Sequence, residues 1–212
     1  MKNLAFVGYL LFLSLPMFAQ QRAVTETGDQ AVLYNDGAWV YAEKDTLNVD
    51  EIPLNPRPYT RSKKASFRLK SKRIDIGCWI DPKTWKFQAA QSHESAEFEI
   101  DHVDGSMYAL IITENLDVST VDLGNLAIQN ARSAAPDLKV THREYRIVNG
   151  TKVLMMRMTG TIENIHFSYF GYYFAEDGGS TQFLVYAAED FMEENLYEAE
   201  DLLNGLVSMH NK

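Results

Sequence analysis

The residues that could perform acid–base or metal chemistry are few and widely spaced. The five histidines fall in different expected elements: His93, His102, His142, His166 and His210. A metal site built from His142 and His166 would need a third ligand such as Glu144. A hydrolase site could combine Glu114, Glu144 and one histidine. The sequence has no His-x-x-x-His or Cys-x-x-Cys pair, Gly-rich phosphate loop or Gly-x-Ser-x-Gly turn. We therefore expect no catalytic residue, no metal and no cofactor, and a chain that is not an enzyme.

Cys78 is the only cysteine, so no intramolecular disulfide can form. A lone thiol in a globular domain usually behaves as a small apolar side chain. A nucleophilic role would need a histidine placed beside the thiol, and no spacing in the sequence supports that pair. We expect Cys78 to be buried and inert.

The segment His166–Phe174 is unusually rich in aromatic residues, with six phenylalanine and tyrosine rings. Gly171 inside it indicates a bulge, or a place where another backbone or a ligand approaches closely. Tyrosine combines an apolar ring with a polar hydroxyl, which suits sugars and peptides. We predict a candidate aromatic groove at Tyr169, Tyr172 and Tyr173. The alternative is that these rings only pack in the core, on both faces of a buried strand.

The segment Arg61–Arg73 contains seven basic residues and no acidic one. It could contact an anionic lipid, a polysaccharide or an acidic protein. The candidate partner-contact residues are Arg61, Lys63, Lys64 and Arg68. The alternative is an edge strand, because Phe67 and Leu69 alternate with basic residues and charges on sheet edges prevent aggregation. Residues 176–201 hold nine carboxylates and no Lys or Arg, so the two segments can complement each other across the fold.

A sheet between Leu138 and Ala188 must position most of these side chains. Four apolar, aromatic-rich runs are separated by turn sequences: Leu138–Val148, Lys152–Ile162, His166–Ala175 and Thr181–Ala188. Asn-Gly after the first run and Asp-Gly after the third supply the positive φ angles that tight hairpins require. The pattern predicts a four-stranded antiparallel meander. Both faces of its strands are apolar, so the sheet needs cover on both faces.

Further strands and two helices are expected around the meander. Strands are predicted at Ile74–Ile80, Ala96–His102 and Met107–Glu114. One helix begins after Ser119, which forms a capping-box pattern with Asp122, and Pro136 stops it. A second helix is predicted from Asp190 to about Met209. The fold class is therefore α+β, an antiparallel sheet of about six to seven strands covered by helices in an α/β/α sandwich.

The first nineteen residues have the pattern of a secretory signal peptide. Lys2 precedes the apolar run Leu4–Leu15, and Ala19 offers a small residue before the cut. This run is too short to span a bilayer and no later stretch is apolar enough, so we expect no transmembrane segment. The mature protein is expected outside the cytoplasm, either periplasmic or secreted.

Residues 20–59 are predicted to form a short β-hairpin and a linker, followed by the main domain at residues 60–212. In Gln30–Ala42 two β-prone runs flank an Asn-Asp-Gly turn. Glu43–Tyr59 contains three prolines and no apolar period, which predicts a linker. Its Asp-Thr-Leu motif matches a bacterial periplasmic O-glycosylation pattern, which makes Thr46 a candidate modification site.

Composition limits the classes of function. The chain is 46% hydrophobic and 23% charged, as in an ordinary globular protein, and its formal net charge is −9. The affinity of proteins for nucleic acid comes largely from neutralising phosphates, so an acidic chain argues against that partner.

Several phrases resemble the PsbP-like fold shared by the photosystem protein PsbP and the Ran-binding protein Mog. They are Trp85, the strand end ALIITENLDVS, the helix region NLAIQNARSAAPDLKV, the turn YRIVNGTKVL and a closing helix. The phrases also look like a set of secreted bacterial proteins of unknown function. The resemblance covers about residues 61–207. It implies an accessory or docking module without catalysis, and no functional residue of the family maps onto this chain.

Three functions are compatible with the sequence. The leading one is a non-catalytic, secreted or periplasmic accessory protein that docks onto an envelope protein. The second is a binder of a sugar, peptide or lipid through an aromatic groove. The third is a hydrolase with an unrecognised site. Ionisable groups that converge in one pocket would favour the enzyme. A groove lined by aromatic rings, without such groups, would favour the ligand binder. A flat surface would favour the docking protein.

Overall fold

The computed structural model describes residues 21–24, 30–33, 39–41, 52–176 and 178–209. The chain divides into two compact units, residues 1–45 and 46–212. The signal peptide expected at residues 1–19 and the candidate site Thr46 both lie outside the described residues. Among the described residues, no helix combines the length and the apolar character that crossing a membrane requires.

The first unit contains a three-stranded antiparallel sheet in the order β1 (Gln21–Val24), β2 (Gln30–Leu33) and β3 (Trp39–Tyr41). Strands β2 and β3 form the predicted hairpin, with Ala31 opposite Tyr41 and Leu33 opposite Trp39. Strand β1 pairs with β2 and was not predicted, because its sequence QRAV is short and carries no apolar alternation.

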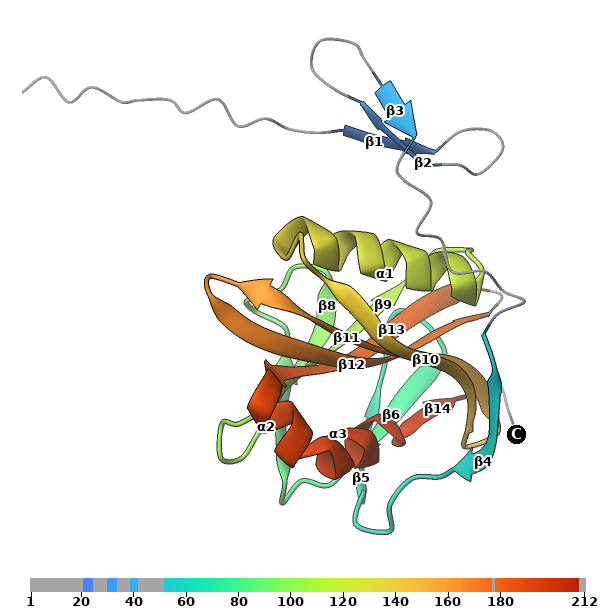
Figure 1. Ribbon diagram of the computed structural model, residues 1–212. Helices are drawn as coiled ribbons and strands as arrows, with labels where there is room; N and C mark the ends of the chain where they lie inside the picture. The colour runs from blue at the N-terminus through green and yellow to red at the C-terminus, as the bar shows by residue number, and fades with distance from the viewer. Residues whose placement is uncertain (1–20, 25–29, 34–38, 42–51, 177, 210–212) are drawn as a thin grey trace, which may run out of the picture. The chain divides into compact units, whose positions relative to one another are not determined.

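The second unit is built around the predicted meander. Strands β10 (Lys139–Val148), β11 (Thr151–Ile162), β12 (Ile165–Glu176) and β13 (Gly179–Ala188) pair antiparallel in sequence order. They are the long central ribbons of Figure 1. Asn149 and Gly150, at the turn between β10 and β11, have φ angles of 49° and 87°. This is the left-handed region that Asn-Gly turns favour, so the prediction is confirmed together with its cause.

The complete sheet has eight strands, in the order β4-β10-β11-β12-β13-β9-β8-β7, and not six to seven. Strands β8 (Ala96–His102) and β9 (Tyr108–Glu114) are the predicted hairpin. The two edge strands, β4 (Leu54–Tyr59) and β7 (Trp85–Ala89), were missed. Both are short and mostly exposed, so they lack the apolar alternation that marks a half-buried strand.

Strand β4 corrects the linker prediction for residues 54–59. It pairs parallel with β10, where the backbone N–H of Tyr145 donates to the carbonyl of Pro53 at 2.8 Å. At the other end of the strand, the N–H of Asn149 donates to the carbonyl of Tyr59 at 2.9 Å. Prolines cannot donate, but their carbonyls still accept, which is why an edge strand tolerates them. The prolines therefore predicted a linker, although the segment is a paired strand.

Helix α1 (Thr120–Ala134) lies on one face of the sheet and packs on β11 and β12 (Figure 1). Ser119 caps it as predicted. Its Oγ accepts from the N–H of Asp122 at 3.1 Å and donates to the Asp122 carboxylate at 2.6 Å. The helix and this sheet face share one buried cluster, which includes Leu123 and Ile128 of α1 and Met156 of β11.

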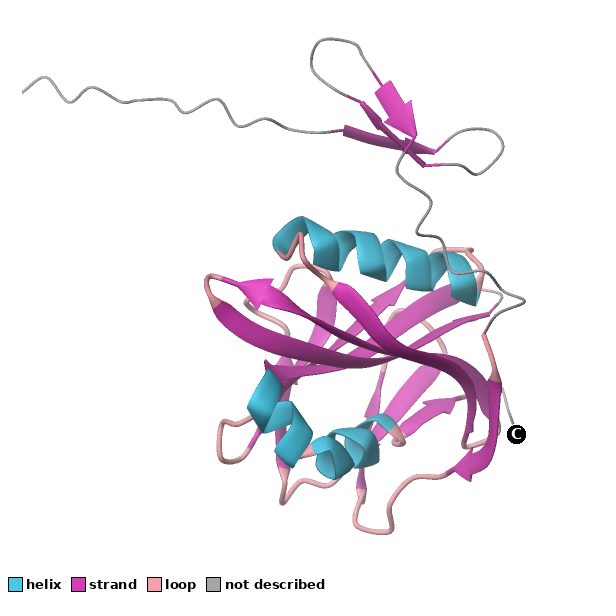
Figure 2. Cartoon of the chain, viewed as in Figure 1, coloured by secondary structure: helices cyan, strands magenta, loops and turns pink. Residues whose placement is uncertain are grey.

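The opposite face carries two short helices and a second sheet (Figure 2). The helices are α2 (Glu189–Glu194) and α3 (Leu196–Leu203), and the sheet has the order β14 (Leu206–Ser208), β6 (Ile76–Ile80) and β5 (Phe67–Lys70). Side chains of both layers join one buried cluster with the large sheet. The cover on this face therefore consists of two helices and a small sheet. The sequence pattern did not show that β5, β6 and β14 form a sheet of their own.

The single C-terminal helix predicted from Asp190 to Met209 is wrong. Helix α2 ends at Asn195, whose backbone N–H and side-chain amide both donate to the carbonyl of Phe191. After α3 the chain turns at Gly205, where a Cβ atom would lie 1.9 Å from the carbonyl oxygen of Trp79. The Gly205 carbonyl accepts from the Trp79 N–H at 2.8 Å, which brings β14 alongside β6. The leucine stripe is compatible with a helix, so the sequence did not reveal this three-residue strand.

Candidate functional site

A cavity of about 330 Å³ lies between α1 and the exposed half of the sheet, and we call it the α1 cleft. Its helix side is made of small and polar side chains: Ala127, Asn130, Ala131 and Ala134. Its sheet side comes from strands β9, β11, β12 and β13. Its rim includes His93 and Ser95 of the β7–β8 connection. Small residues on α1 leave space that larger ones would fill.

The floor of the α1 cleft is a grid of three cross-strand rows. The first row pairs Tyr169 with Tyr186, the second Gly171 with Leu184 and Leu110, and the third Tyr173 with Gln182 and Ile112. Beyond the third row, Glu114 lies opposite Ser180. The floor therefore changes along the strands from aromatic, through aliphatic, to polar.

Gly171 sets the depth of the floor. A Cβ atom at Gly171 would lie 3.0 Å from the hydroxyl of Tyr173 and 3.1 and 3.2 Å from atoms of its ring. The ring of Tyr173 therefore lies over the glycine, next to the second row. This explains why glycine occurs within an otherwise aromatic strand, in line with the predicted close approach.

The hydroxyl of Tyr173 has no hydrogen-bond partner among the described residues, although the residue is only 1% exposed. Burial raises the pKa of this phenol well above its usual value, so it stays protonated and can donate. Buried polar groups without partners are uncommon in native proteins, and each costs free energy. The cleft thus contains an unused donor.

The tyrosine rings of the first row pack against each other and against neighbouring rings. Tyr186 stacks on Tyr108 with ring centroids 5.8 Å apart, and its ring is tilted against Tyr169 at 5.9 Å. Phe167 makes an edge contact with Tyr169 at 4.8 Å. Because each ring packs against its neighbours at a different angle, the rings together form an apolar wall and not a flat platform.

The rim near His93 is held in place by Glu99. The backbone N–H groups of Gln91, Ser92 and His93 donate to its carboxylate at 3.2, 2.8 and 3.1 Å, and Nδ1 of His93 lies 3.1 Å from the same oxygen. Hydrogen bonds from the His93 ring and the Ser92 backbone lower the pKa of Glu99 to about 2. The imidazole of His93 is therefore tied to Glu99 at the edge of the cleft.

The structure divides the predicted aromatic groove. Tyr169 and Tyr173 line the α1 cleft, whereas Tyr172 is fully buried on the opposite face of the sheet. The prediction was wrong for Tyr172 because neighbouring residues of a strand point to opposite faces. Residues that the sequence did not indicate come from β9 and β13. The alanines of α1 were a usable signal, since Ala127, Ala131 and Ala134 recur at helical spacing.

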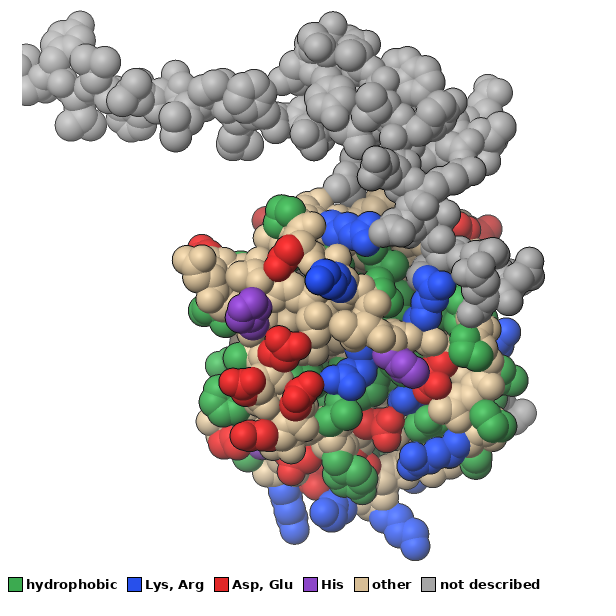
Figure 3. Space-filling model, viewed as in Figure 1, with side chains coloured by type: hydrophobic (Ala, Val, Ile, Leu, Met, Phe, Trp, Pro, Cys, Tyr) green, Lys and Arg blue, Asp and Glu red, His purple; other side chains and the backbone are tan. Residues whose placement is uncertain are grey.

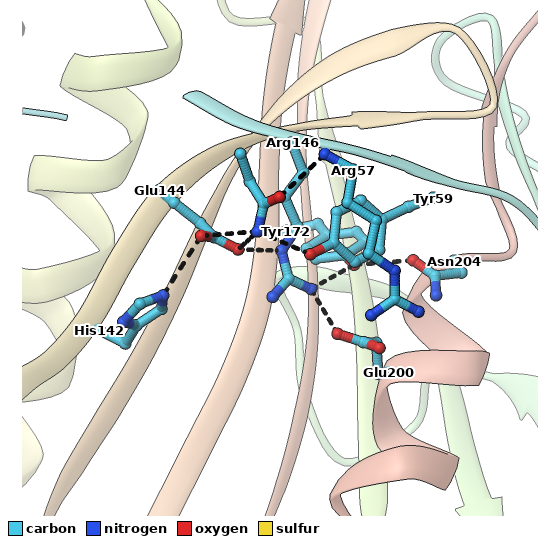
Figure 4. Close-up of polar contacts among 9 residues, drawn as sticks. Arg57, Tyr59, His142, Glu144, Arg146, Tyr172, Glu200 and Asn204 are labelled. Atoms are coloured by element: carbon cyan, nitrogen blue, oxygen red, sulfur yellow. Dashed lines mark hydrogen bonds and ion pairs between the residues drawn. The ribbon is translucent and has the colours of Figure 1, made fainter. Parts of the chain in front are cut away.

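A second polar cluster, which we call the Arg146 network, lies on the other face (Figure 4). Nε of Arg146 donates to Glu144 at 2.6 Å, and one terminal nitrogen donates to Tyr172 at 3.0 Å and to Glu200 of α3 at 2.7 Å. The guanidinium carbon lies 4.2 Å from the centre of the Tyr59 ring. The network joins β4, β10, β12 and α3.

The carboxylate of Glu144 is saturated by its neighbours. The side-chain amide of Asn55 donates to both carboxylate oxygens, at 3.1 and 3.0 Å, and to the hydroxyl of Tyr59 at 2.9 Å. Burial alone would raise the pKa of Glu144, but the bonds from Arg146 and Asn55 outweigh it and hold the pKa below its usual value. Such a charge-paired carboxylate is suited to holding strands together.

The residues of the hydrolase and metal alternatives are not brought together. Glu114 lines the α1 cleft, while Glu144 belongs to the Arg146 network on the opposite face of the sheet. Nε2 of His142 lies 3.4 Å from Glu144, but His166 contacts Thr161. In the part of the chain that the structure describes, no three His, Cys, Asp or Glu side chains gather as a metal site would require. Cys78 is buried, and burial raises the pKa of its thiol.

The basic segment Arg61–Arg73 contains the edge strand β5, as the alternative interpretation predicted. The guanidinium carbons of Arg61 and Arg68 lie 4.1 and 5.3 Å from the centre of the Trp79 ring. Lys64 lies near Asp201 of α3; burial raises the pKa of that carboxyl, and the charge of Lys64 only partly opposes this rise. Three of the four candidate contact residues therefore have neighbours within the fold, and all four are exposed. Figure 3 shows acidic side chains gathered over α2 and α3, with basic side chains projecting below them.

No protein-family model matches the sequence, and the search of curated proteins found no significant match. Among solved structures, cyanobacterial PsbP (CyanoP) from Synechocystis sp. PCC 6803 is similar with a TM-score of 0.51 and 10% identity, over 67% of this chain and 91% of that one.

Two other solved structures are less similar. A protein from Bacteroides thetaiotaomicron matches with a TM-score of 0.43 and 11% identity, over 66% of this chain and 47% of that one. LpqN, involved in cell envelope biogenesis of Mycobacterium tuberculosis, matches with a TM-score of 0.41 and 12% identity, over 61% and 79% of the two chains. The fold of this chain is therefore PsbP-like, as the sequence resemblance implied.

Proposed function

We propose that this protein is a non-catalytic accessory protein that acts outside the cytoplasm and binds a small ligand with an apolar body in the α1 cleft. The observation that carries the proposal is the half-covered sheet face. Leu184, Tyr186 and Ile112 are only partly buried beside the cavity, and the hydroxyl of Tyr173 at its floor has no partner. A fold that needed only a packed core would fill this space.

The size and lining of the α1 cleft agree with a binding role. Small-molecule pockets typically enclose about 300–1,000 Å³ and combine apolar walls with a few polar groups. The cleft falls at the lower end of that range, with about 330 Å³. A ligand there would cover apolar surface that water now contacts, at roughly 25 cal/mol per Å².

The ionisable groups of the cleft support binding over catalysis. Among the described residues that line the cleft, Glu114 and His93 are the only ones of the types Asp, Glu, His, Lys or Arg. Nδ1 of His93 is held by Glu99, which orients the ring at the rim of the cleft. The sequence-based signal peptide and the PsbP-like fold support an extracytoplasmic accessory role, as proposed from the sequence.

The experiment is a fluorescence titration with Nile red, an uncharged apolar dye whose emission rises when it leaves water. The test variant is Asn130→Trp, which places a large side chain at the cleft from an exposed position on α1. The matched control is Ser133→Trp, because Ser133 is also exposed on α1 and does not line the cleft.

We expect saturable binding by the wild type and by Ser133→Trp, and at least tenfold weaker binding by Asn130→Trp. Both variants should unfold at nearly the wild-type denaturant concentration, since surface substitutions cost little. Equal binding by all three proteins, or no saturable binding by any, would show that the α1 cleft is not the ligand site.

Protein docking is the second candidate function, favoured by an exposed aromatic pair next to the basic edge strand. Phe67 of β5 and Phe87 of β7 are 43% and 39% exposed, and their rings stack with centroids 4.8 Å apart. Arg68 and Lys70, also exposed on β5, alternate with Phe67 and so project from the other face of the same edge strand. Aromatic residues bordered by basic ones suit an acidic protein surface.

A further inference from the structure

The α1 cleft offers different chemistry at its two ends. Tyr169 and Tyr186 form the aromatic end, and Gln182 and Glu114 form the polar end. Between them lie Leu184 and Leu110, paired across β13 and β9. Each step of two residues along a strand covers about 7 Å, so the graded floor extends over about 14 Å along the strands. This shape suits a chain-like molecule with an apolar part and a polar head.

The donor of Tyr173 lies between the two ends. Its ring extends over Gly171, which places the hydroxyl in the aliphatic second row, one row from Gln182. If the polar head of a bound ligand lies at Gln182 and Glu114, the first few atoms of its apolar chain lie next to this hydroxyl. A hydrogen-bond acceptor at that point would satisfy the buried donor.

The charges of the lining select the head group. Glu114 is a carboxylate at the polar end, and no Lys or Arg is among the described residues that line the cleft. Glu99 adds a second negative charge behind His93. An anionic head would meet repulsion here, whereas a hydroxylated head can hydrogen-bond with Gln182, Asn130 and Glu114.

The ring arrangement disfavours a sugar as the main ligand. Sugars bind to exposed faces of aromatic rings, but one face of Tyr186 stacks on Tyr108 and its ring is tilted against that of Tyr169. An acyl chain needs only apolar contact and fits this wall.

We propose that the ligand is an uncharged single-chain acyl ester with a hydroxylated head, whose carbonyl accepts a hydrogen bond from Tyr173 and whose chain lies over Leu184 and Leu110. This inference rests on the proposed function and specifies its ligand class. The head lies at Gln182 and Glu114, and the chain ends at the tyrosines of the first row.

The test is isothermal titration calorimetry of the full chain with four probes, each below its micelle concentration. Monodecanoylglycerol carries the ester, decylglycerol ether lacks only the carbonyl, decanoate carries an anionic head, and maltose is a sugar without a chain. We expect the wild type to bind the ester about fivefold more tightly than the ether and at least tenfold more tightly than decanoate. Maltose should not bind.

Tyr173→Phe separates the hydrogen bond from packing. The variant keeps the ring and removes an unpartnered buried hydroxyl, so it should fold with unchanged or higher stability. It should bind ester and ether equally well, with the ether affinity of the wild type. A retained fivefold preference for the ester in Tyr173→Phe would overturn the role of this hydroxyl.

Glu114→Gln tests the selection of the head group. It should strengthen decanoate binding several-fold and so reduce the preference for monodecanoylglycerol over decanoate. The control Glu94→Gln removes an exposed carboxylate of the β7–β8 connection that does not line the cleft, and it should change neither affinity. If decanoate or maltose binds the wild type as tightly as the ester, the ligand class is wrong. In that case the proposed function still stands if Nile red binding remains sensitive to Asn130→Trp, and it falls with the ligand class if it does not.

Discussion

Tyr173 and Gly171 show how two residues of one strand create both a space and a functional group. Without a side chain at Gly171, the ring of Tyr173 can lie along the strand, with its hydroxyl 3.0 Å from where a Cβ would be. Neighbouring Tyr172 points to the other face, where its hydroxyl donates to Asn204 at 2.8 Å. The hydroxyl of Tyr172 is paired within the core, whereas that of Tyr173, a residue that lines the α1 cleft, is buried without a partner among the described residues.

Met156 and Leu184 allow packing and binding to be separated by single substitutions. Met156 is fully buried and Leu184 only partly, although both lie on the α1 face of the sheet. Met156→Ala should lower the free energy of unfolding by ~2–5 kcal/mol, because it leaves a cavity in the core. Leu184→Ala should cost less and weaken Nile red binding. Urea denaturation and dye titration measure both effects. A loss below ~1 kcal/mol for Met156→Ala would place this residue outside the core.

Arg146 should be the most costly of the buried polar residues to remove. Arg146→Met would leave Glu144 and Glu200 without their common partner, and such losses destabilise by ~3–5 kcal/mol. Denaturant titrations of wild type and variant over a range of pH measure the difference.

The pH dependence of that difference follows from Glu144. Its pKa is lowered in the folded protein, so the stability it contributes is present above the unfolded-state pKa of ~4.3 and is lost as the pH falls through the lower folded-state value. The cost of Arg146→Met should therefore be largest near neutral pH and shrink in acid. A cost that stays constant from neutral to acidic pH would contradict the pairing.

At the scale of elements, strands with strong local signals could be predicted and strands defined by distant contacts could not. The meander has Asn149 and Gly150 at one turn and alternating apolar residues along each strand, and it was found within about two residues at each end. Strand β14 exists because Gly205 lies against Trp79, more than a hundred positions away. No local pattern of a three-residue strand contains that information.

The α1 cleft was predictable only in part for the same reason. Tyr169 and Tyr173 were identified from the aromatic composition of one strand. Leu110, Ile112 and Gln182 become cleft residues only because β13 pairs with β9, and the sequence does not specify that pairing. The half-open state of the face depends on where α1 crosses the sheet, which is a property of the assembled layers.

The basic segment gives a prediction at the element scale, because its four candidate residues fall into two pairs. Arg61→Ala with Arg68→Ala removes the charges next to the Trp79 ring, and cation–π contacts at exposed sites are each worth ~0.5–1 kcal/mol. Lys63→Ala with Lys64→Ala should leave the thermal midpoint nearly unchanged. If the segment docks onto an acidic envelope protein, both pairs should weaken retention of that protein, more strongly at low salt. Retention that survives both pairs, with stability lost in the arginine pair alone, would make the segment purely structural.

At the scale of the whole second unit, the two faces of the large sheet are treated differently. One face is covered by α2, α3 and the sheet of β5, β6 and β14, which share a single buried cluster with it. On the other face, the helix among the described residues is α1, packed on β11 and β12, and Ile52 joins the same buried cluster. The likeness to cyanobacterial PsbP establishes the fold and not the ligand. The uncovered half of this face is therefore what the functional proposal depends on.

The most direct test of the central claim is a methyl NMR titration of the wild-type chain with Nile red. The signals of Leu110, Ile112, Leu184 and Ala131 report on the α1 cleft, and those of Leu69, Val185 and Leu206 report on the covered face. The account predicts that the first group shifts progressively to saturation while the second stays unchanged. Shifts centred on Leu69, or spread evenly over both groups, would contradict a ligand site in the α1 cleft.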